Sequence, residues 1–436
     1  MRAISTFTDW TAMSGCWGRT GVCRIFEQLR IAGIRDVYWR VFNGGLAMYP
    51  SRVAEAQGRQ VYDFVVAHDE YPFSNRPVHY VREVDFNRYD SLPDAFEVAE
   101  EFGINLHLWY SIYEDEHGRA YQSKLNADLP HCRHTDREGR QYSGTFDWYY
   151  PEIRDYKLAI IDELLAYPAK GIMLDLVRHN ATASADANGI HRFGYNPEIR
   201  AAFKEAHGAD PLELTADDPE WLAFKTEIRT SLIREIRHRM DRRGNALELS
   251  LMLWPLDYLP WACIDVPALT GEGAVQMLAG FSLTYSMSPD EARLHMDVLK
   301  RQCGGEDVLI MPGLSSYGGL TSDHVDVFAQ AAEEAGAPGV MLYEADSLVK
   351  FDITPAVRVI NAGRPRYKRS LQAGRVAAAD APWDTVPVFD DFLYHFGQNP
   401  DEVPSERTSV RLAFNDEALM IRFECDDRDM AAALAP

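Results

Sequence analysis

The chain has 436 residues, of which 46% are hydrophobic and 25% are charged, and these are ordinary values for a globular protein. Its formal net charge of −22 argues against the basic surface that binds nucleic acid or anionic lipid, so we expect neither partner. No run of about 18 apolar residues is present, and we expect no membrane-spanning segment. The six cysteines form no Cys-x-x-Cys pair, which indicates reduced, structural thiols, and we expect no cofactor.

The N-terminal residues 1–10 predict a strand and lack the apolar stretch of a signal peptide. Two locations agree with this pattern. One is the cytoplasm, and the other is the periplasm or the cell exterior for a chain whose signal peptide has been removed. The sequence predicts no particular oligomeric state.

Eight β-rich segments follow one another along the chain, and longer helical patterns lie between most of them. The strands are predicted at residues 3–9, 35–42, 104–110, 171–178, 246–254, 280–286, 307–314 and 339–344. The helices are predicted at residues 23–32, 92–102, 152–165, 219–243, 289–302 and 322–336. Such alternation favours an α/β fold with a parallel sheet, and eight units favour a (β/α)₈ TIM barrel. The alternative is an open, doubly wound sheet, but no Gly-x-Gly-x-x-Gly motif follows the first strand.

The composition and the hydrophobic periodicity of the sequence change after the eighth strand. We expect the barrel at 1–363, a basic linker at 364–380 and a partial β-sandwich at 381–436. The clearest signal in the last region is a pair of alternating segments, 409–414 and 419–425, joined by a short polar turn, which predicts a hairpin.

Active sites of such barrels lie at the C-terminal ends of the strands, and polar and aromatic residues are frequent there in this chain. We assign ten of them to substrate binding: Asp9, Arg40, Asn43, His107, Trp109, Arg178, His179, Trp254, Tyr285 and Tyr317. Aromatic rings with polar edges suit the apolar faces of sugar rings, and the alternative interpretation is packing beneath long loops.

Asp175 is the strongest catalytic candidate, because it ends an apolar segment in which an unpaired carboxylate is costly to bury. The alternative is a structural pair with Arg178. Glu344 ends the eighth strand in the same way, and Asp115 and Glu114 are competing candidates after the third strand. Glycoside hydrolysis uses two carboxyl groups, and we expect Asp175 to point into an open cleft ringed by aromatic side chains.

The sequence contains weaker signals for other kinds of catalytic site. No Gly-x-Ser-x-Gly elbow is present, which argues against a serine hydrolase. Asp9, His107 and Asp175 are a set that a metal ion could bind, and this alternative stays open. Glu248 is predicted at the bottom of the barrel in a structural role, because it precedes Trp254 by six residues.

Four segments, at 36–51, 89–109, 150–156 and 171–178, resemble glycosyl-hydrolase-like family 10, a family of bacterial barrels. The first reads Asp-Val-Tyr-Trp-Arg-Val-Phe-Asn-Gly-Gly-Leu-Ala-Met-Tyr-Pro-Ser, and the last reads Gly-Ile-Met-Leu-Asp-Leu-Val-Arg. The second ends in His-Leu-Trp, and the third reads Tyr-Pro-Glu-Ile-Arg-Asp-Tyr. The resemblance implies hydrolysis of glycosidic bonds in a polysaccharide. It also implies that His107, Trp109, Asp175 and Arg178 occupy site positions.

The chain departs from that family close to the site. Leu176 and Val177 stand where the family has a second Asp and a Tyr, and Ser111 stands where it has an Asn. The tail from residue 381 resembles the start of a family-9-type carbohydrate-binding domain.

We therefore expect a glycoside hydrolase acting on a carbohydrate substrate. Asp175 would be its nucleophile or base, and Glu344 or Asp115 its acid. A non-catalytic glycan-binding barrel is the alternative, and a metal-dependent barrel hydrolase is a further one.

Overall fold

The chain divides into two compact units, Met1–Asn361 and Ala362–Pro436. The computed structural model describes residues 1–14, 16–68, 84–116, 121–177, 192–244, 246–255, 257–281, 288–315, 319–362, 374–375, 383, 388–389, 408–415 and 419–425. Among these residues, no helix combines the length and the apolar character that crossing a membrane requires.

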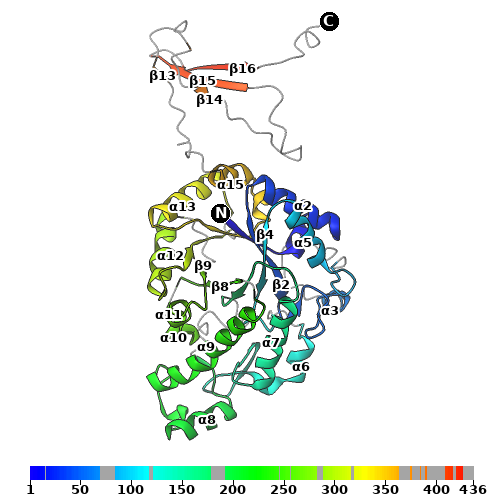
Figure 1. The fold of residues 1–436 in the computed structure, drawn as a ribbon, viewed down its shortest axis with the longest axis vertical. Helices are drawn as coiled ribbons and strands as arrows, with labels where there is room; N and C mark the ends of the chain where they lie inside the picture. The colour runs from blue at the N-terminus through cyan, green and yellow to red at the C-terminus, as the bar shows by residue number, and fades with distance from the viewer. Residues whose placement is uncertain are drawn as a thin grey trace. The chain divides into compact units, whose positions relative to one another are not determined.

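The first unit is a parallel barrel with helices outside it (Figure 1). Its strands are β1 (Arg2–Ser5), β2 (Asp36–Asn43), β4 (Asn105–Tyr110), β7 (Gly171–Asp175), β8 (Glu248–Leu253), β9 (Met277–Gly280), β10 (Leu309–Met311), β11 (Gly313–Ser315) and β12 (Met341–Tyr343). They are hydrogen-bonded in the order β10-β9-β8-β7-β4-β2-β1-β12-β11. The predicted α/β barrel is therefore confirmed.

The barrel closes through a divided strand. β10 pairs with β9 and β11 pairs with β12, and only Pro312 separates β10 from β11. Proline has no N–H to donate and therefore interrupts a ladder. The two short strands are halves of one seventh strand, which bonds one neighbour with its first half and the other neighbour with its second. At Gly313 an added Cβ would lie 1.9 Å from the carbonyl oxygen of Gly280, so the two strands nearly touch.

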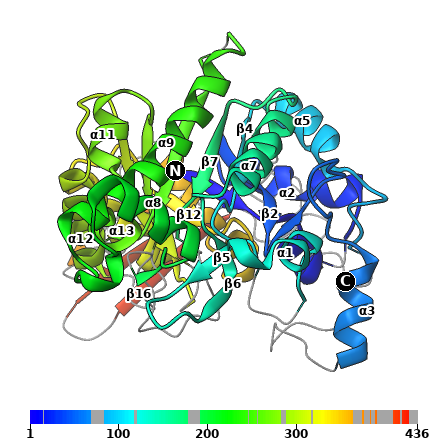
Figure 2. The ribbon, with the colours of Figure 1, turned by 90° about the horizontal axis from the view of Figure 1, so that it is seen from below.

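Helices surround the strands in both ribbon views (Figures 1 and 2). The larger ones that precede strands are α2 (Arg19–Ile31), α5 (Ser91–Glu101), α7 (Pro151–Leu164), α9 (Pro219–Asp241), α12 (Pro289–Arg301) and α13 (Ser322–Glu334). Local chemistry explains where they begin. Proline opens α7, α9 and α12, where its missing N–H costs nothing, and Asp218 and Ser288 cap α9 and α12 with their side chains.

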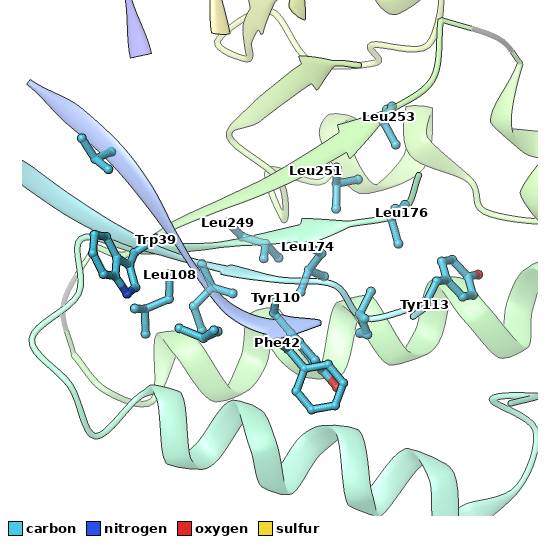
Figure 3. Close-up of a cluster of buried hydrophobic side chains, with 14 of the residues drawn as sticks. Trp39, Phe42, Leu108, Tyr110, Tyr113, Leu174, Leu176, Leu249, Leu251 and Leu253 are labelled. Carbon is cyan, nitrogen blue, oxygen red and sulfur yellow. The ribbon is translucent and has the colours of Figure 1, made fainter. Parts of the chain in front are cut away.

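The two faces of each strand carry different side chains. On β8, Leu249, Leu251 and Leu253 point outward and join the core between the sheet and the helices. Figure 3 shows this outer core, with Phe42 and Tyr110 directed at the helices. The opposite face lines the barrel interior, which is filled by a second cluster that includes Met173, Met252, Met277, Met311 and Met341.

Polar side chains fill the lower end of the interior, where the strands begin. Arg2 donates to Glu248 at 2.9 Å, and Tyr38 donates to the same carboxylate at 2.6 Å. Burial alone raises the pKa of Glu248, but the charges of His107 and Arg2 and two side-chain hydrogen bonds outweigh it, so the pKa is lowered. Glu248 therefore lies at the bottom of the barrel, as the sequence predicted.

Two predicted strands are displaced. The first ends at Ser5, and helix α1 (Phe7–Ser14) follows it, so Asp9 lies in a helix and not at a strand end. The alternation of large residues suggested a strand, but Phe7 and Trp10 are both buried at a helical spacing. The sixth strand ends at Gly280, where it was predicted to begin.

Shorter elements fill the connections. They are β3 (Leu46–Ala47), α3 (Arg59–His68), α6 (Lys124–Asp128), η1 (Pro130–Cys132), β5 (Arg133–Thr135), β6 (Gln141–Phe146), α8 (Pro197–His207), η4 (Pro211–Glu213), α10 (Tyr258–Ala262), α11 (Val266–Gly271), α14 (Ser347–Lys350) and α15 (Thr354–Asn361). The connection after the third strand contains a hairpin, because β5 pairs antiparallel with β6.

The second unit contains a small sheet. Its strands are β13 (Gly374–Arg375), β14 (Val388–Phe389), β15 (Thr408–Phe414) and β16 (Leu419–Cys425). β15 and β16 pair antiparallel from Phe414–Leu419 to Thr408–Cys425, as the alternating pattern predicted. That this sheet belongs to a carbohydrate-binding sandwich stays a prediction.

Candidate active site

Asp175 ends β7 at the upper, C-terminal mouth of the barrel. Its side chain lies on the interior face, because it is two positions beyond Met173, which lines the interior. The carboxylate accepts hydrogen bonds from the Val177 backbone N–H at 2.9 Å and from the Ser111 hydroxyl at 3.4 Å. Both bonds favour the ionised carboxylate. Asp175 is 0% exposed in this structure, so the expected open cleft at this carboxylate is not observed.

Arg40 links this carboxylate to a second one. Its guanidinium donates to the Ser111 hydroxyl at 3.2 Å and to Glu114 at 2.7 Å. It also lies over the Trp109 ring, 4.5 Å from the ring centroid. Ser111 therefore lies between the guanidinium of Arg40 and the carboxylate of Asp175. Asp175, Ser111, Arg40 and Glu114 thus form a continuous hydrogen-bonded network.

Four aromatic side chains from four strands or strand ends continue the mouth, and we call them the aromatic wall: Trp109, Tyr343, Phe281 and Trp254. Neighbouring rings in this order meet edge to face, at 6.0, 4.5 and 5.1 Å between centroids. Trp254 donates from its indole nitrogen to the Val177 carbonyl at 3.1 Å. The wall therefore reaches the turn that follows Asp175, and Trp254 is its partly exposed member.

Tyr258 supports the same turn from α10. Its hydroxyl donates to the Leu176 carbonyl at 3.2 Å and accepts the Trp254 backbone N–H at 3.0 Å. Burial raises the pKa of Tyr258 well above its usual value, and the nearby charge of Asp175 adds to the effect. The phenol therefore stays protonated and remains a donor.

Glu344 follows β12 directly, and the peptide bond that joins it to Tyr343 is cis. It is 6% exposed, and its carbonyl accepts hydrogen bonds from the Ser347 backbone N–H, at 3.1 Å, and from the Ser347 hydroxyl. β7 and β12 are the fourth and eighth barrel strands and lie four places apart in the sheet order. Asp175 and Glu344 therefore stand on opposite sides of the mouth.

Asp115 is placed differently. Its carboxylate forms an ion pair with Lys157 of α7 at 2.7 Å and accepts the Phe146 backbone N–H at 2.9 Å. Lys157 also donates to the Ile112 carbonyl at 2.6 Å. Burial lowers the pKa of Lys157, although Asp115 acts in the opposite direction. Because α7 covers the outer face of the sheet, this carboxylate is directed away from the barrel interior.

His107 does not reach the mouth. It stacks on Tyr38 at 4.5 Å between ring centroids, and its ring nitrogens lie 3.6 Å from Asp36 and 3.8 Å from Glu248. It therefore belongs to the polar end at the bottom of the barrel. The sequence predicted His107 among the substrate-binding residues at the C-terminal ends of the strands. It lies three residues before the end of β4 and therefore lower in the barrel.

The remaining predicted residues are scattered. Asn43 ends β2 and pairs with Leu46 in a short hairpin, and Asp9 lies in the first turn of α1. Both are partly exposed. Four residues assigned to substrate lie outside the described residues: Arg178, His179, Tyr285 and Tyr317.

The proposed metal set is not brought together. In the register of β4 and β7, Leu108 lies opposite Ile172. His107 is therefore four residues below Asp175, about 13 Å along the strands. Within the described part of the chain, no three His, Cys, Asp or Glu side chains form a group that could hold a metal ion.

Comparisons with solved structures find the same barrel. The chain aligns with a β-galactosidase from the psychrophilic Marinomonas ef1 at a TM-score of 0.51 and 12% identity, over 83% of this chain and 59% of that one. It also aligns with the catalytic domain of a β-amylase from Paenibacillus polymyxa at a TM-score of 0.49 and 9% identity, over 84% and 99%. At 12% identity the likeness to the β-galactosidase shows the fold alone.

Searches by sequence give no match, either among protein-family models or among curated proteins. The resemblance to glycosyl-hydrolase-like family 10 thus stays a prediction.

Two supporting residues were not among the predicted site residues. The sequence marks Ser111 only as a departure from a family pattern, and Tyr258 was assigned no role. The signal in the sequence that could have identified both residues is their position along the chain. Both lie within five residues of a strand's C-terminal end, where side chains and the turns of neighbouring strands meet.

Proposed function

We propose that this chain is a glycoside hydrolase that cleaves a poly- or oligosaccharide with two carboxyl groups. The observation that carries the proposal is the placement of Asp175. It lies on the interior face at the end of the fourth strand, with hydrogen bonds that favour its charged form, beside an aromatic wall. The fold shared with a β-galactosidase agrees with the proposal but does not carry it.

Each carboxyl group has a role in this proposal. Asp175 is the ionised member and acts as nucleophile on the anomeric carbon or as base toward water. Glu344, on the opposite side of the mouth, is the acid that protonates the leaving oxygen. We give Asp115 a structural role, because Lys157 and Phe146 already engage its carboxylate.

The aromatic wall provides a second feature that the proposed reaction needs, which is a flat apolar surface for the sugar ring. The transition state of glycoside hydrolysis carries positive charge on the sugar ring, and flat rings contact a sugar's apolar face. Asp175 has no exposed surface, and Trp254 is the partly exposed member of the wall, so a sugar can reach Asp175 and the other three rings only when the groups that cover them move.

The test is the change Asp175→Asn, which keeps the size of the side chain and removes its charge. We expect turnover to fall by about 10³-fold or more, measured as reducing ends released from a polysaccharide panel and as aryl glycoside hydrolysis. The melting temperature should show that the variant still folds.

A matched control is Asp36→Asn, which changes a carboxylate on the bottom layer of the same barrel. This variant should keep its turnover. If Asp175→Asn folds and turns over substrate at the unchanged rate, Asp175 has no part in the mechanism.

A non-catalytic glycan-binding barrel is the second candidate. The observation that favours it is the burial of Asp175, whose carboxylate accepts hydrogen bonds from the protein itself. Binding of a glycan without release of reducing ends, unchanged in Asp175→Asn, would support this candidate over the hydrolase.

A further inference from the structure

We propose that Ser111 and Arg40 are positioning residues for Asp175, and that together they orient its carboxylate and hold it in the ionised form. The catalytic part of this inference rests on the proposed function. The structural part does not, because it concerns the state of one carboxylate.

The direction of the hydrogen bonds follows from the groups involved. A guanidinium only donates hydrogen bonds, so Ser111 must accept the bond from Arg40 at 3.2 Å. The hydrogen of the Ser111 hydroxyl is then left for another acceptor, and an oxygen of Asp175 lies 3.4 Å away. The hydroxyl therefore donates to Asp175, and this bond is stronger to the ionised carboxylate than to the neutral acid.

Arg40 is fixed firmly enough to impose this direction. Its side chain is 3% exposed, its Nε donates to the Phe42 carbonyl at 3.1 Å, and its Nη2, which also donates to Ser111, donates to Glu114 at 2.7 Å. The Trp109 ring supports its face. A guanidinium held on three sides cannot turn away, so the hydroxyl of Ser111 has one orientation.

The expected size of the effect is modest. Glu114 neutralises most of the charge of Arg40, so Asp175 feels a polarised hydroxyl and not a free cation. The 3.4 Å contact is also long for a bond between two oxygens. The charged and titratable groups around Asp175 include Arg40, Glu114 and Tyr258. Tyr258 contributes no charge, since burial raises its pKa well above the usual value.

The change Ser111→Ala removes the hydroxyl between the two charges. A hydrogen bond that favours the charged form lowers the pKa of a carboxyl group, so its loss raises that pKa. We expect the acidic limb of the kcat/KM profile to move up by about half to one pH unit. We also expect kcat to fall by about tenfold with little change in KM, and Ser111→Thr, which keeps the hydroxyl, to restore both.

A direct titration makes the test independent of turnover. Infrared spectra of protein labelled with ¹³C in the aspartate carboxyl groups follow ionisation, and subtracting the spectrum of the same variant with Asp175→Asn isolates Asp175. The same upward shift should appear there. If Ser111→Ala does not fold, Ser111→Cys keeps the volume with a much weaker donor and serves in its place.

Ser250→Ala is the matched control. Ser250 is a buried interior serine whose hydroxyl donates to the Glu248 carboxylate at 2.6 Å, at the other end of the barrel. It should leave both the acidic limb and the Asp175 titration unchanged.

The outcomes separate the two proposals. A shifted titration in a protein that cleaves no glycoside supports the positioning role and overturns the hydrolase. Cleavage with an unmoved Asp175 titration in Ser111→Ala overturns the positioning role and keeps the hydrolase. An equal shift in Ser250→Ala, or a shift in Ser111→Thr as large as in Ser111→Ala, also overturns it.

Discussion

Two aspartates near strand ends show how residues of one type take different roles. Asp175 lies on the interior face of the barrel, whereas Asp115 is paired with Lys157 toward the helices. Both are almost completely buried, so burial does not distinguish them. The partner does, because a fixed ammonium at 2.7 Å engages Asp115 within the fold, in agreement with the structural role proposed for it.

The buried pair gives a prediction at this scale. The change Lys157→Met should lower the free energy of unfolding by about 3–5 kcal/mol, because it leaves the charge of Asp115 buried without a cationic partner. Chemical denaturation measures the loss.

The same pair also tests the role given to Asp115. In Asp115→Asn we expect lower stability but unchanged turnover per folded molecule. A variant that melts like the parent chain and has lost its turnover would make Asp115 catalytic after all.

At the scale of elements, helices were easier to predict than strands. Pro151, Pro219 and Pro289 mark the first residues of three helices, and such signals are local. Strand limits depend on neighbours. The seventh strand was predicted as one segment, but each of its halves bonds a different neighbour, and Pro312 divides them. No local pattern shows which neighbour a strand will meet.

The divided strand gives a prediction about packing. Gly313→Ala should lower the free energy of unfolding by more than about 3 kcal/mol. Its Cβ would lie 1.9 Å from the backbone oxygen of Gly280, which cannot yield as a flexible side chain would. Thermal or chemical denaturation checks this.

A control is available in Gly271→Ala. Gly271 ends α11, and an added Cβ there would meet nothing closer than 3.4 Å. We expect a change within about 1 kcal/mol. Equal losses at the two glycines would mean that the contact of the two strands does not matter for stability.

At the scale of the whole molecule, the sequence predicted the barrel and part of its mouth. Asp175 and Trp254 lie at strand ends as expected. His107 was placed too high, because the depth of a residue depends on the register between strands, which pairs it with Tyr38. The role of Ser111 was missed for a related reason, since two neighbouring strands are needed to bring it between Arg40 and Asp175.

The boundary between the units gives the last prediction. Residues 1–362 should fold alone, because α15 buries Val357 against the barrel, and Asn361 bonds both the N-terminal ammonium and the Ala32 carbonyl. A chain ending at residue 352 lacks these contacts and should lose the cooperative melting transition, as followed by circular dichroism. If both truncated chains melt alike, α15 is dispensable.

The methionines of the barrel interior have a consequence for its shape. Five unbranched thioether side chains fill much of the space beneath the mouth, and such chains adapt to their surroundings and do not impose a form on them. The packing beneath the mouth is therefore adaptable and does not fix the positions of the groups above it. The geometry of the mouth must therefore be set by the groups around it, which are the rigid guanidinium of Arg40 and the edge-to-face rings of the aromatic wall. Substitutions of the five methionines should be tolerated far better than substitutions of Arg40 or of the wall residues.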